Sequence, residues 1–186
     1  IEEGLEELTL DMGLGFIERV RPGTGALQTL LQYTEHYFLV RKAALSPQPD
    51  AQGMHFGAPL TWQEAAELPL CLMTSEMYNR HIVDGAFAKA GVRVQPVLET
   101  NSLLTLALSA VGGAVSCVMP GALVGAVRAY RELEARPLSS PEVRTSIGFM
   151  FQTAERHSRP LEAALTLAQD AAWLRHAAAH SGLLHA

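Results

Sequence analysis

Three polar residues, Thr100, Asn101 and Ser102, separate an apolar segment from a short apolar helix expected to begin near residue 103. Hydroxyl and amide groups at the first turn of a helix, beside its free backbone N–H groups, suit the binding of a small polar or anionic ligand. The same residue types are also the usual N-caps of helices. The sequence therefore leaves two interpretations open for this segment, a ligand-binding turn and a set of helix caps.

A second polar segment follows another apolar strand, expected at residues 68–73. It contains Thr74, Ser75 and Arg80 and leads into a helix expected at residues 79–90. If the two strands are parallel neighbours, their carboxyl ends meet at one edge of a sheet, and both polar segments face one cleft. The guanidinium of Arg80 is suited to pairing with a carboxylate or another oxyanion, although an arginine here is more often a solvated surface residue.

The other reactive side chains form no recognisable catalytic group. The sequence has no G-x-S-x-G motif, and Ser116 falls inside an expected strand, where a nucleophile is poorly placed. His176 and His180 have the spacing of two zinc ligands on a helix, but no acidic or thiol partner lies between or just after them. The G-L-G sequence at residues 13–15 lacks the third glycine of a dinucleotide-binding loop. We therefore expect no enzymatic activity, no cofactor and no metal ion.

Strands and helices alternate along the chain, which predicts an α/β fold with largely parallel strands. The clearest unit is residues 98–120, a strand, a helix ended by Gly112 and Gly113, and a second strand. A capping-box sequence at residues 61–64 begins a helix that we expect to end at residue 66. Further strands are expected at residues 9–17, 27–31, 37–41, 68–73, 92–99, 133–138 and 144–152, and further helices at residues 1–8, 79–90, 121–130 and 159–180.

The composition is that of a globular protein with a sizeable core, since 48% of the 186 residues are hydrophobic and 18% are charged. The formal net charge is −5, from 14 basic and 19 acidic residues, which argues against direct binding of nucleic acid by this chain. The longest apolar stretch, residues 103–118, is interrupted by glycines and polar residues, so we expect no membrane span. Cys71 and Cys117 fall in apolar strands and are expected to be reduced, buried residues of a cytoplasmic protein.

In their order and spacing, these segments resemble the effector-binding domain of LysR-type transcriptional regulators. The resemblance extends over nearly the whole chain and is carried by the segments GLEELTLDMGLGF, YFLVRKAALS, LTWQEAAELPLCLM, NRHIVDGAFAKAG, ETNSLLTLALSAVGGAVSCVMP and RTSIGFMF, the last followed by a long helix. The pair Gly112-Gly113 departs from the family's more usual G-x-G pattern, which affects the turn but not its place.

The resemblance implies an α/β, periplasmic-binding-protein-like fold of two Rossmann-like lobes joined by crossover strands, with a ligand cleft between the lobes. We expect residues 1–55 and 141–186 to form lobe I and residues 56–140 to form lobe II. The resemblance also implies that a winged helix-turn-helix, a linker helix and the first strand, helix and second strand of lobe I precede this chain. Lobe I would then be incomplete.

The function implied by the resemblance is binding of a small anionic metabolite as co-inducer, with transmission to a DNA-binding domain absent from this chain. The implied partners are the small-molecule effector, further copies of the chain in a homodimer or homotetramer with the helix at residues 79–90 at the interface, and DNA only through the missing winged helix-turn-helix. A periplasmic-type solute-binding receptor without enzymatic activity is the alternative on the same fold. The expected ligand-binding residues are Phe16, Thr74, Ser75, Arg80, Thr100, Asn101 and Ser102.

Overall fold

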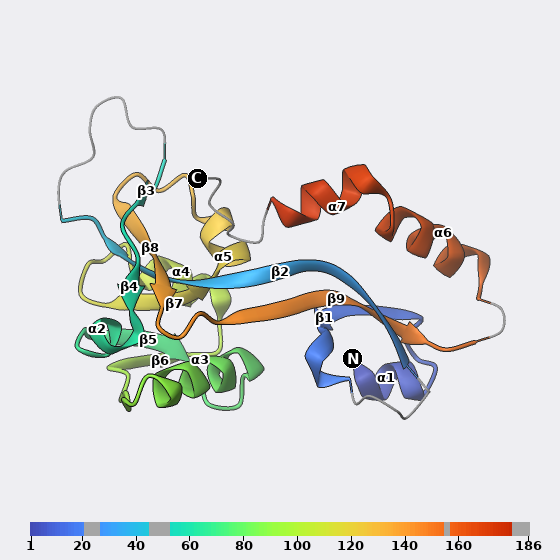
Figure 1. The fold of residues 1–186 in the computed structure, drawn as a ribbon, viewed down its shortest axis with the longest axis horizontal. Helices are drawn as coiled ribbons and strands as arrows, with labels where there is room; N and C mark the ends of the chain where they lie inside the picture. Colours follow the sequence, from blue (N-terminus) through green and yellow to red (C-terminus); the bar gives the residue numbers. More distant parts are fainter. Residues whose placement is uncertain (21–26, 45–52, 155–156, 180–186) are drawn as a thin grey trace. The chain divides into compact units, whose positions relative to one another are not determined.

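The computed structural model describes residues 1–20, 27–44, 53–154 and 157–179. The chain forms two compact units, which are unit 1, residues 1–35 and 144–186, and unit 2, residues 36–143 (Figure 1). These boundaries differ from the expected ones at residues 55–56 and 140–141. The first boundary moves because residues 37–42 are strand residues that pair with strands of unit 2.

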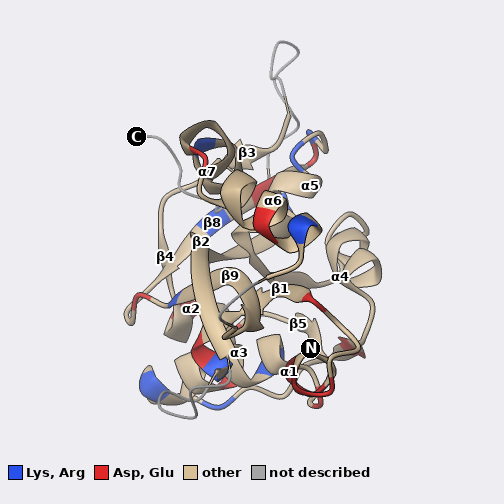
Figure 2. Ribbon diagram, turned by 90° about the vertical axis from the view of Figure 1, so that its right-hand side faces the viewer, with Lys and Arg blue, Asp and Glu red and all other residues tan. Residues whose placement is uncertain are grey.

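Unit 1 is built on a sheet with the strand order β1-β9-β2. Its elements are α1 (Glu2–Glu6), β1 (Met12–Phe16), the 3₁₀ helix η1 (Ile17–Arg19), the first part of β2 (Leu27–Lys42), β9 (Arg144–Gln152), α6 (Arg159–Ala168) and α7 (Ala171–Ala178). β1 and β9 are antiparallel, with Gly15 opposite Gly148. A Cβ atom on Gly148 would lie 2.6 Å from the carbonyl oxygen of Leu30, so β9 and β2 approach each other too closely there for any other residue. In Figure 2, acidic residues gather on α1.

Two predictions for unit 1 are wrong in detail. The strands expected at residues 27–31 and 37–41 form one continuous strand, β2, because the polar residues between them are also extended and Gln32 is buried and hydrogen-bonded. The single helix expected at residues 159–180 is two helices, α6 and α7. Asp170 separates them, since its carboxylate accepts hydrogen bonds from the first N–H groups of α7. His180, the second residue of the proposed zinc pair, lies outside the described residues.

Unit 2 contains a mixed sheet, whose remaining strands are β3 (His55–Phe56), β4 (Leu60–Thr61), β5 (Leu70–Met73), β6 (Leu98–Thr100), β7 (Ser116–Pro120) and β8 (Leu133–Ser139). β5 is parallel to β6 and β7, whereas the second part of β2 is antiparallel to β7 on one side and β8 on the other. The prediction of largely parallel strands is therefore correct for β5, β6 and β7. It is wrong for β2 and β8 and for the β1–β9 pair, because local sequence patterns do not encode strand direction.

Helices cover both faces of the unit 2 sheet (Figure 1), and they are α2 (Trp62–Ala66), α3 (Tyr78–Lys89), α4 (Leu103–Ser109) and α5 (Gly121–Ala126). Successive side chains of β5 point to opposite faces, and all of them are buried. Leu72 packs in one core with Trp62 and Phe87, and Met73 packs in the other core with Leu106 of α4. Both faces of the sheet are therefore covered at β5, and the carboxyl ends of such parallel strands are the usual place for a ligand.

The predicted strand-helix-strand unit at residues 98–120 is confirmed as β6, α4 and β7. Its first strand and the following helix α5 are shorter than predicted. Gly113 follows α4 with a φ of +77°, which is the left-handed backbone conformation expected of a glycine that ends a helix. The capping box at residues 61–64 is also confirmed at the start of α2.

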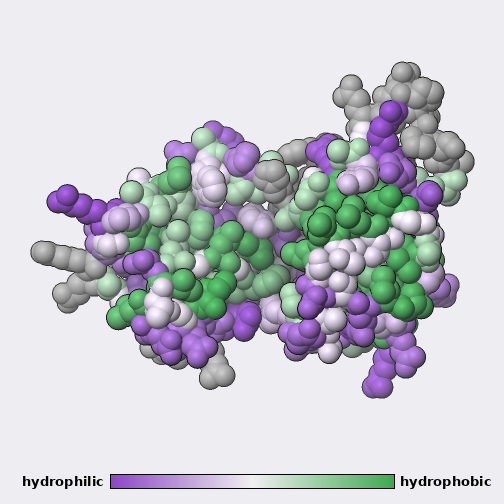
Figure 3. Space-filling model, turned by 180° about the vertical axis from the view of Figure 1, so that it is seen from behind, coloured by the Kyte–Doolittle hydropathy of each residue, from purple (hydrophilic) through white to green (hydrophobic). Residues whose placement is uncertain are grey.

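Within the described ranges, every helix is too short or too polar to cross a membrane. Figure 3 shows apolar surface on one face of the molecule, and the exposed large apolar residues of α4 are Leu103, Leu104 and Leu108.

Candidate ligand-binding site

The two polar segments singled out in the sequence lie at the carboxyl ends of neighbouring parallel strands of unit 2. β5 ends at Met73 and β6 at Thr100, and these two residues are paired in register. The backbone N–H of Thr74 then donates to the carbonyl oxygen of Thr100 over 3.0 Å. Segment 74–77 and segment 100–102 are therefore side by side, as the sequence predicted.

Within segment 100–102, two of the three side chains stabilise the turn itself. The hydroxyl oxygen of Ser102 caps α4 by accepting a hydrogen bond of 3.2 Å from the backbone N–H of Thr105. The hydroxyl oxygen of Thr100 accepts a hydrogen bond of 3.1 Å from the backbone N–H of Ser102. Asn101 is exposed, and its side chain makes no hydrogen bond with the described part of the chain. Its amide can therefore reach a ligand without breaking an internal contact.

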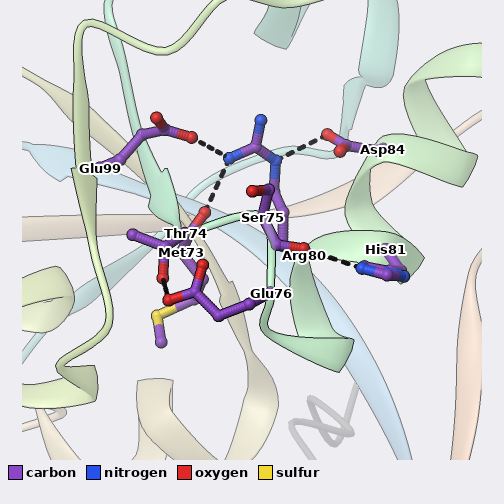
Figure 4. Close-up of polar contacts among 8 residues, drawn as sticks. All are labelled: Met73, Thr74, Ser75, Glu76, Arg80, His81, Asp84 and Glu99. Atoms are coloured by element: carbon purple, nitrogen blue, oxygen red, sulfur yellow. Dashed lines mark hydrogen bonds and ion pairs between the residues drawn. The ribbon is translucent and has the colours of Figure 1, made fainter.

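Segment 74–77 does not cap the next helix, although Thr74 and Ser75 are residue types that often do. Helix α3 begins at Tyr78 after Met77, which offers no polar cap. The hydroxyl of Thr74 instead donates a hydrogen bond of 2.7 Å to the carboxylate of Glu76, and this contact lowers the pKa of Glu76 (Figure 4). Ser75 is exposed, and its carbonyl oxygen accepts a hydrogen bond of 2.8 Å from Nε2 of His81. The Ser75 hydroxyl makes no hydrogen bond among the described residues, so it resembles Asn101 in being available.

Arg80 is held by the protein on three sides (Figure 4). Its Nη1 donates to the carbonyl oxygen of Met73 over 2.7 Å and also to the carboxylate of Glu99, and its Nε donates to Asp84 over 2.8 Å. Burial acts to lower the pKa of Arg80, but the hydrogen bonds to Asp84 and Glu99 outweigh burial and raise it above its ordinary value. The side chain is only 10% exposed, so Arg80 is not the solvated surface residue that its position in the sequence favoured.

Phe16 belongs to unit 1, whereas the other six expected ligand-binding residues belong to unit 2. It is the last residue of β1, where it is half-buried and lies opposite Ile147 of β9. The 3₁₀ helix η1 follows directly, and the carboxylate of Glu18 in it accepts a hydrogen bond of 2.9 Å from the backbone N–H of Ser146. The turn after β1 is thus tied to the start of β9 within unit 1.

The described residues hold no group of three His, Cys, Asp or Glu side chains that could bind a metal ion. Cys71 and Cys117 are paired across β5 and β7 and are both fully buried. Burial raises the pKa of both thiols, so they are protonated at neutral pH. They are core residues, in agreement with the prediction from their apolar surroundings.

The sequence reasoning missed Asp84 and Glu99 as partners of Arg80. The i, i+4 spacing of Arg80 and Asp84 on an expected helix was a usable signal for their ion pair. Glu99 had no such signal, because its approach to Arg80 depends on β6 lying beside β5.

Comparison with protein families places most of the chain in one of them. The family model described as the LysR substrate binding domain matches residues 1–173. A comparison with curated protein sequences finds no significant match.

Solved structures of regulators are similar to the chain. The Corynebacterium glutamicum OxyR C206 mutant has a TM-score of 0.71 and 16% identity, over 97% of this chain and 53% of that one. The regulatory domain of Synechocystis PCC6803 CcmR in complex with 2-PG has a TM-score of 0.70 and 11% identity, over 90% of this chain and 76% of that one. The effector binding domain of QuiR in complex with shikimate has a TM-score of 0.66 and 13% identity, over 95% of this chain and 76% of that one.

These likenesses at low sequence identity establish the fold, which is α/β and periplasmic-binding-protein-like with two lobes. The chain spans about half the length of OxyR, at 53%, and about three quarters of the separate CcmR and QuiR domains, at 76% each. Because the family model covers nearly all of the sequence, the chain belongs to the LysR substrate-binding domain family.

Proposed function

We propose that the chain is the effector-binding part of a LysR-type transcriptional regulator and binds a small anionic metabolite between two lobes. The observation that carries the proposal is the direct contact between segments 74–77 and 100–102 at the carboxyl ends of β5 and β6. Open α/β sheets bind their ligands at this end of the strands. The family match favours a regulator over a periplasmic-type solute-binding receptor.

The class of ligand is supported by two similar domains that were solved with small molecules. CcmR was solved with 2-PG, and QuiR with shikimate, which is a hydroxylated carboxylate. In our proposal, Ser75 and Asn101 contact the ligand through the side chains that make no hydrogen bond within the described chain. Thr74, Thr100 and Ser102 shape the turn beside them, and Phe16 of unit 1 supplies an apolar contact.

In this proposal the chain senses and does not catalyse. The ligand changes the balance between two arrangements of the lobes by binding one of them more tightly. A homodimer or homotetramer of a cytoplasmic regulator passes this change to DNA through a winged helix-turn-helix outside this chain. Among the described residues of unit 1, one small core cluster consists of Phe151, Leu161 and Leu165, with Met12 and Leu30 packed against it. A core of this size supports completion of unit 1 by further strands and a helix of the same protein.

The test begins with thermal-shift screening of small carboxylates and phosphate esters against the full regulator, since a ligand raises the melting temperature by mass action. Calorimetry with the best compound then compares Ser75→Ala and Asn101→Ala with the wild type. We expect each variant to bind about tenfold more weakly, the net worth of one hydrogen bond, with an unchanged melting temperature in the absence of ligand.

Ser109→Ala serves as the control, because Ser109 lies at the far end of α4, where its hydroxyl donates to the carbonyl oxygen of Thr105 and contacts the buried thiol of Cys71. It should bind the ligand as the wild type does. Thr100→Ala and Ser102→Ala are less informative, because they also remove hydrogen bonds that hold the start of α4. If both Ser75→Ala and Asn101→Ala retained full affinity, the site assignment would be wrong.

A further inference from the structure

We infer that Arg80 positions the two ligand-facing segments and does not neutralise the ligand. This inference rests on the proposed function, because it assigns a role within the same site. It also changes the expectation from the sequence, in which Arg80 was a ligand-binding residue.

The contacts of Arg80 join three different elements (Figure 4). Arg80 itself lies in the first turn of α3, where it pairs with Asp84 of the same helix. From α3 its guanidinium reaches Met73, the last residue of β5, and Glu99 of β6. Segment 74–77 lies between Met73 and α3, and segment 100–102 directly follows Glu99. One guanidinium therefore fixes both ends of the first segment and the entry to the second.

The charges around Arg80 do not favour an anion. One guanidinium faces two carboxylates, and Glu76 adds a third carboxylate in segment 74–77. The side chain of Arg80 is 10% exposed, whereas those of Asp84 and Glu99 are 49% and 45% exposed. An anion that approaches from solvent therefore meets the carboxylates and not the guanidinium, and replacing either carboxylate would break a charge-assisted hydrogen bond.

The occupied state of Arg80 limits which groups of a ligand unit 2 can recognise. Arg80 is occupied, and the carboxylate of Glu76 is hydrogen-bonded to Thr74. The side chains of the two segments that make no hydrogen bond within the described chain are the neutral hydroxyl of Ser75 and the neutral amide of Asn101. These groups recognise hydroxyl or carbonyl oxygens of the ligand, and the negative charge of the ligand is met outside the two segments. Arg80 sets the spacing between Ser75 and Asn101.

Hydrogen exchange of the full chain without ligand tests the positioning role. In Arg80→Gln, we expect amides of residues 74–77 and 98–102 to exchange about tenfold to a hundredfold faster, since contacts of a charged donor are lost. Asp84→Asn and Glu99→Gln should show smaller increases in the same two segments. Arg136→Gln is the matched control, because Arg136 donates to the carbonyl oxygens of Ala58 and Pro59, and it should leave both segments unchanged.

Arg80→Lys separates positioning from a general loss of structure. A lysine ammonium keeps the charge and can still donate to the Met73 carbonyl, but it lacks the planar fork, so we expect partial rescue of protection in both segments. If Arg80→Gln does not fold, Asp84→Asn and Glu99→Gln carry the test, because both partners are about half exposed. Unchanged exchange in segments 74–77 and 98–102 in these variants would overturn the inference.

The alternative role, in which Arg80 binds the anion, is tested by measuring the melting temperature in inorganic phosphate and in chloride at the same ionic strength. We expect any effect of phosphate on the melting temperature to be equal in the wild type and Arg80→Gln, which removes the positive charge, and a stabilisation lost in Arg80→Gln would show that Arg80 binds anions. The exchange experiment uses no ligand, so a failure of the proposed function would leave its result intact. Conversely, the inference can fail while an effector still binds.

Discussion

The indole N–H of Trp173 donates a hydrogen bond of 2.6 Å to the side-chain oxygen of Gln32. The amide of Gln32, which is 5% exposed in β2, donates in turn to the carbonyl oxygen of Ala168 at the end of α6. Helix α7 contributes no fully buried residue of its own. The partly buried hydrogen bond from Trp173 to Gln32 therefore contributes to the position of α7 on unit 1.

Trp173→Phe should loosen α7, because it removes the donor and leaves the buried oxygen of Gln32 without its partner. We expect a loss of about 1–3 kcal/mol in the free energy of unfolding, measured with urea, and faster hydrogen exchange in residues 171–178. The double variant Gln32→Leu/Trp173→Phe removes both polar partners and should recover part of that loss. Equal stability of Trp173→Phe and the wild type would show that α7 is held in another way.

Gly113→Ala should destabilise the turn between α4 and β7. Gly113 has a φ of +77°, and an added Cβ would lie 2.8 Å from the side chain of Lys42. We expect a cost of about 1–3 kcal/mol in the free energy of unfolding. Gly112→Ala is a matched control with an ordinary φ, and its Cβ would meet no atom closer than 3.6 Å. Similar losses in the two variants would contradict the assigned backbone role of Gly113.

The thiols of Cys71 and Cys117 should be silent toward reagents that need a thiolate. Both are fully buried, and burial raises the pKa of each. With Ellman's reagent at pH 8 we expect no reaction in the native protein over minutes and two reacting thiols in denaturant. A fast stoichiometric reaction of the native chain would mean that the sheet between β5 and β7 opens readily.

The capping box of α2 should weaken in acid. Hydrogen bonds from the backbone N–H and the hydroxyl of Thr61 lower the pKa of Glu64 below its ordinary value of 4.5. A carboxylate with a lowered pKa in the folded state stabilises the fold above its ordinary pKa, and this stabilisation is lost as the pH falls through the folded value.

We therefore expect the stability difference between the wild type and Glu64→Gln to shrink as the pH falls from 6 to 3, measured by urea unfolding at each pH. Glu67→Gln, at the other end of α2, controls for the removal of a carboxylate from the same helix. A difference that does not vary with pH would exclude a role for the ionised form of Glu64.

Local patterns in the sequence predicted most helices and strands of unit 2 and the two polar segments that lie side by side after β5 and β6. Each polar segment follows a short apolar run, and the buried strands β5 and β7 are runs of that kind. The capping residues Thr61 and Ser102 were identifiable for the same reason, since a cap acts on the next residues of the chain. Apolar runs and helix caps can be predicted from the sequence because they depend only on residues that are neighbours in the chain.

What the sequence could not supply depends on pairing between distant residues. The direction of β2 and β8 and the contact of Arg80 with Glu99 follow from strand pairing, which leaves no periodic trace in either strand. The start of α3 after Met77 was obscured by the polar residues before it, because Thr74 bonds to Glu76 and not to the helix. The positioning role that we infer for Arg80 could not be predicted either, because it depends on Glu99, which approaches Arg80 only through the pairing of β5 and β6.

The sealed pair Cys71 and Cys117 makes the chain convenient for site-directed spectroscopy. A single cysteine introduced at Lys89, or at another exposed position of unit 2 outside the two polar segments, would be the one thiol that a maleimide dye or a nitroxide could label in the native protein. A second introduced cysteine on an exposed residue of unit 1 would provide a distance ruler between the two units, without removal of either native thiol. Energy transfer or spin–spin coupling between the labels could then report the separation of the units in the presence and absence of each compound screened.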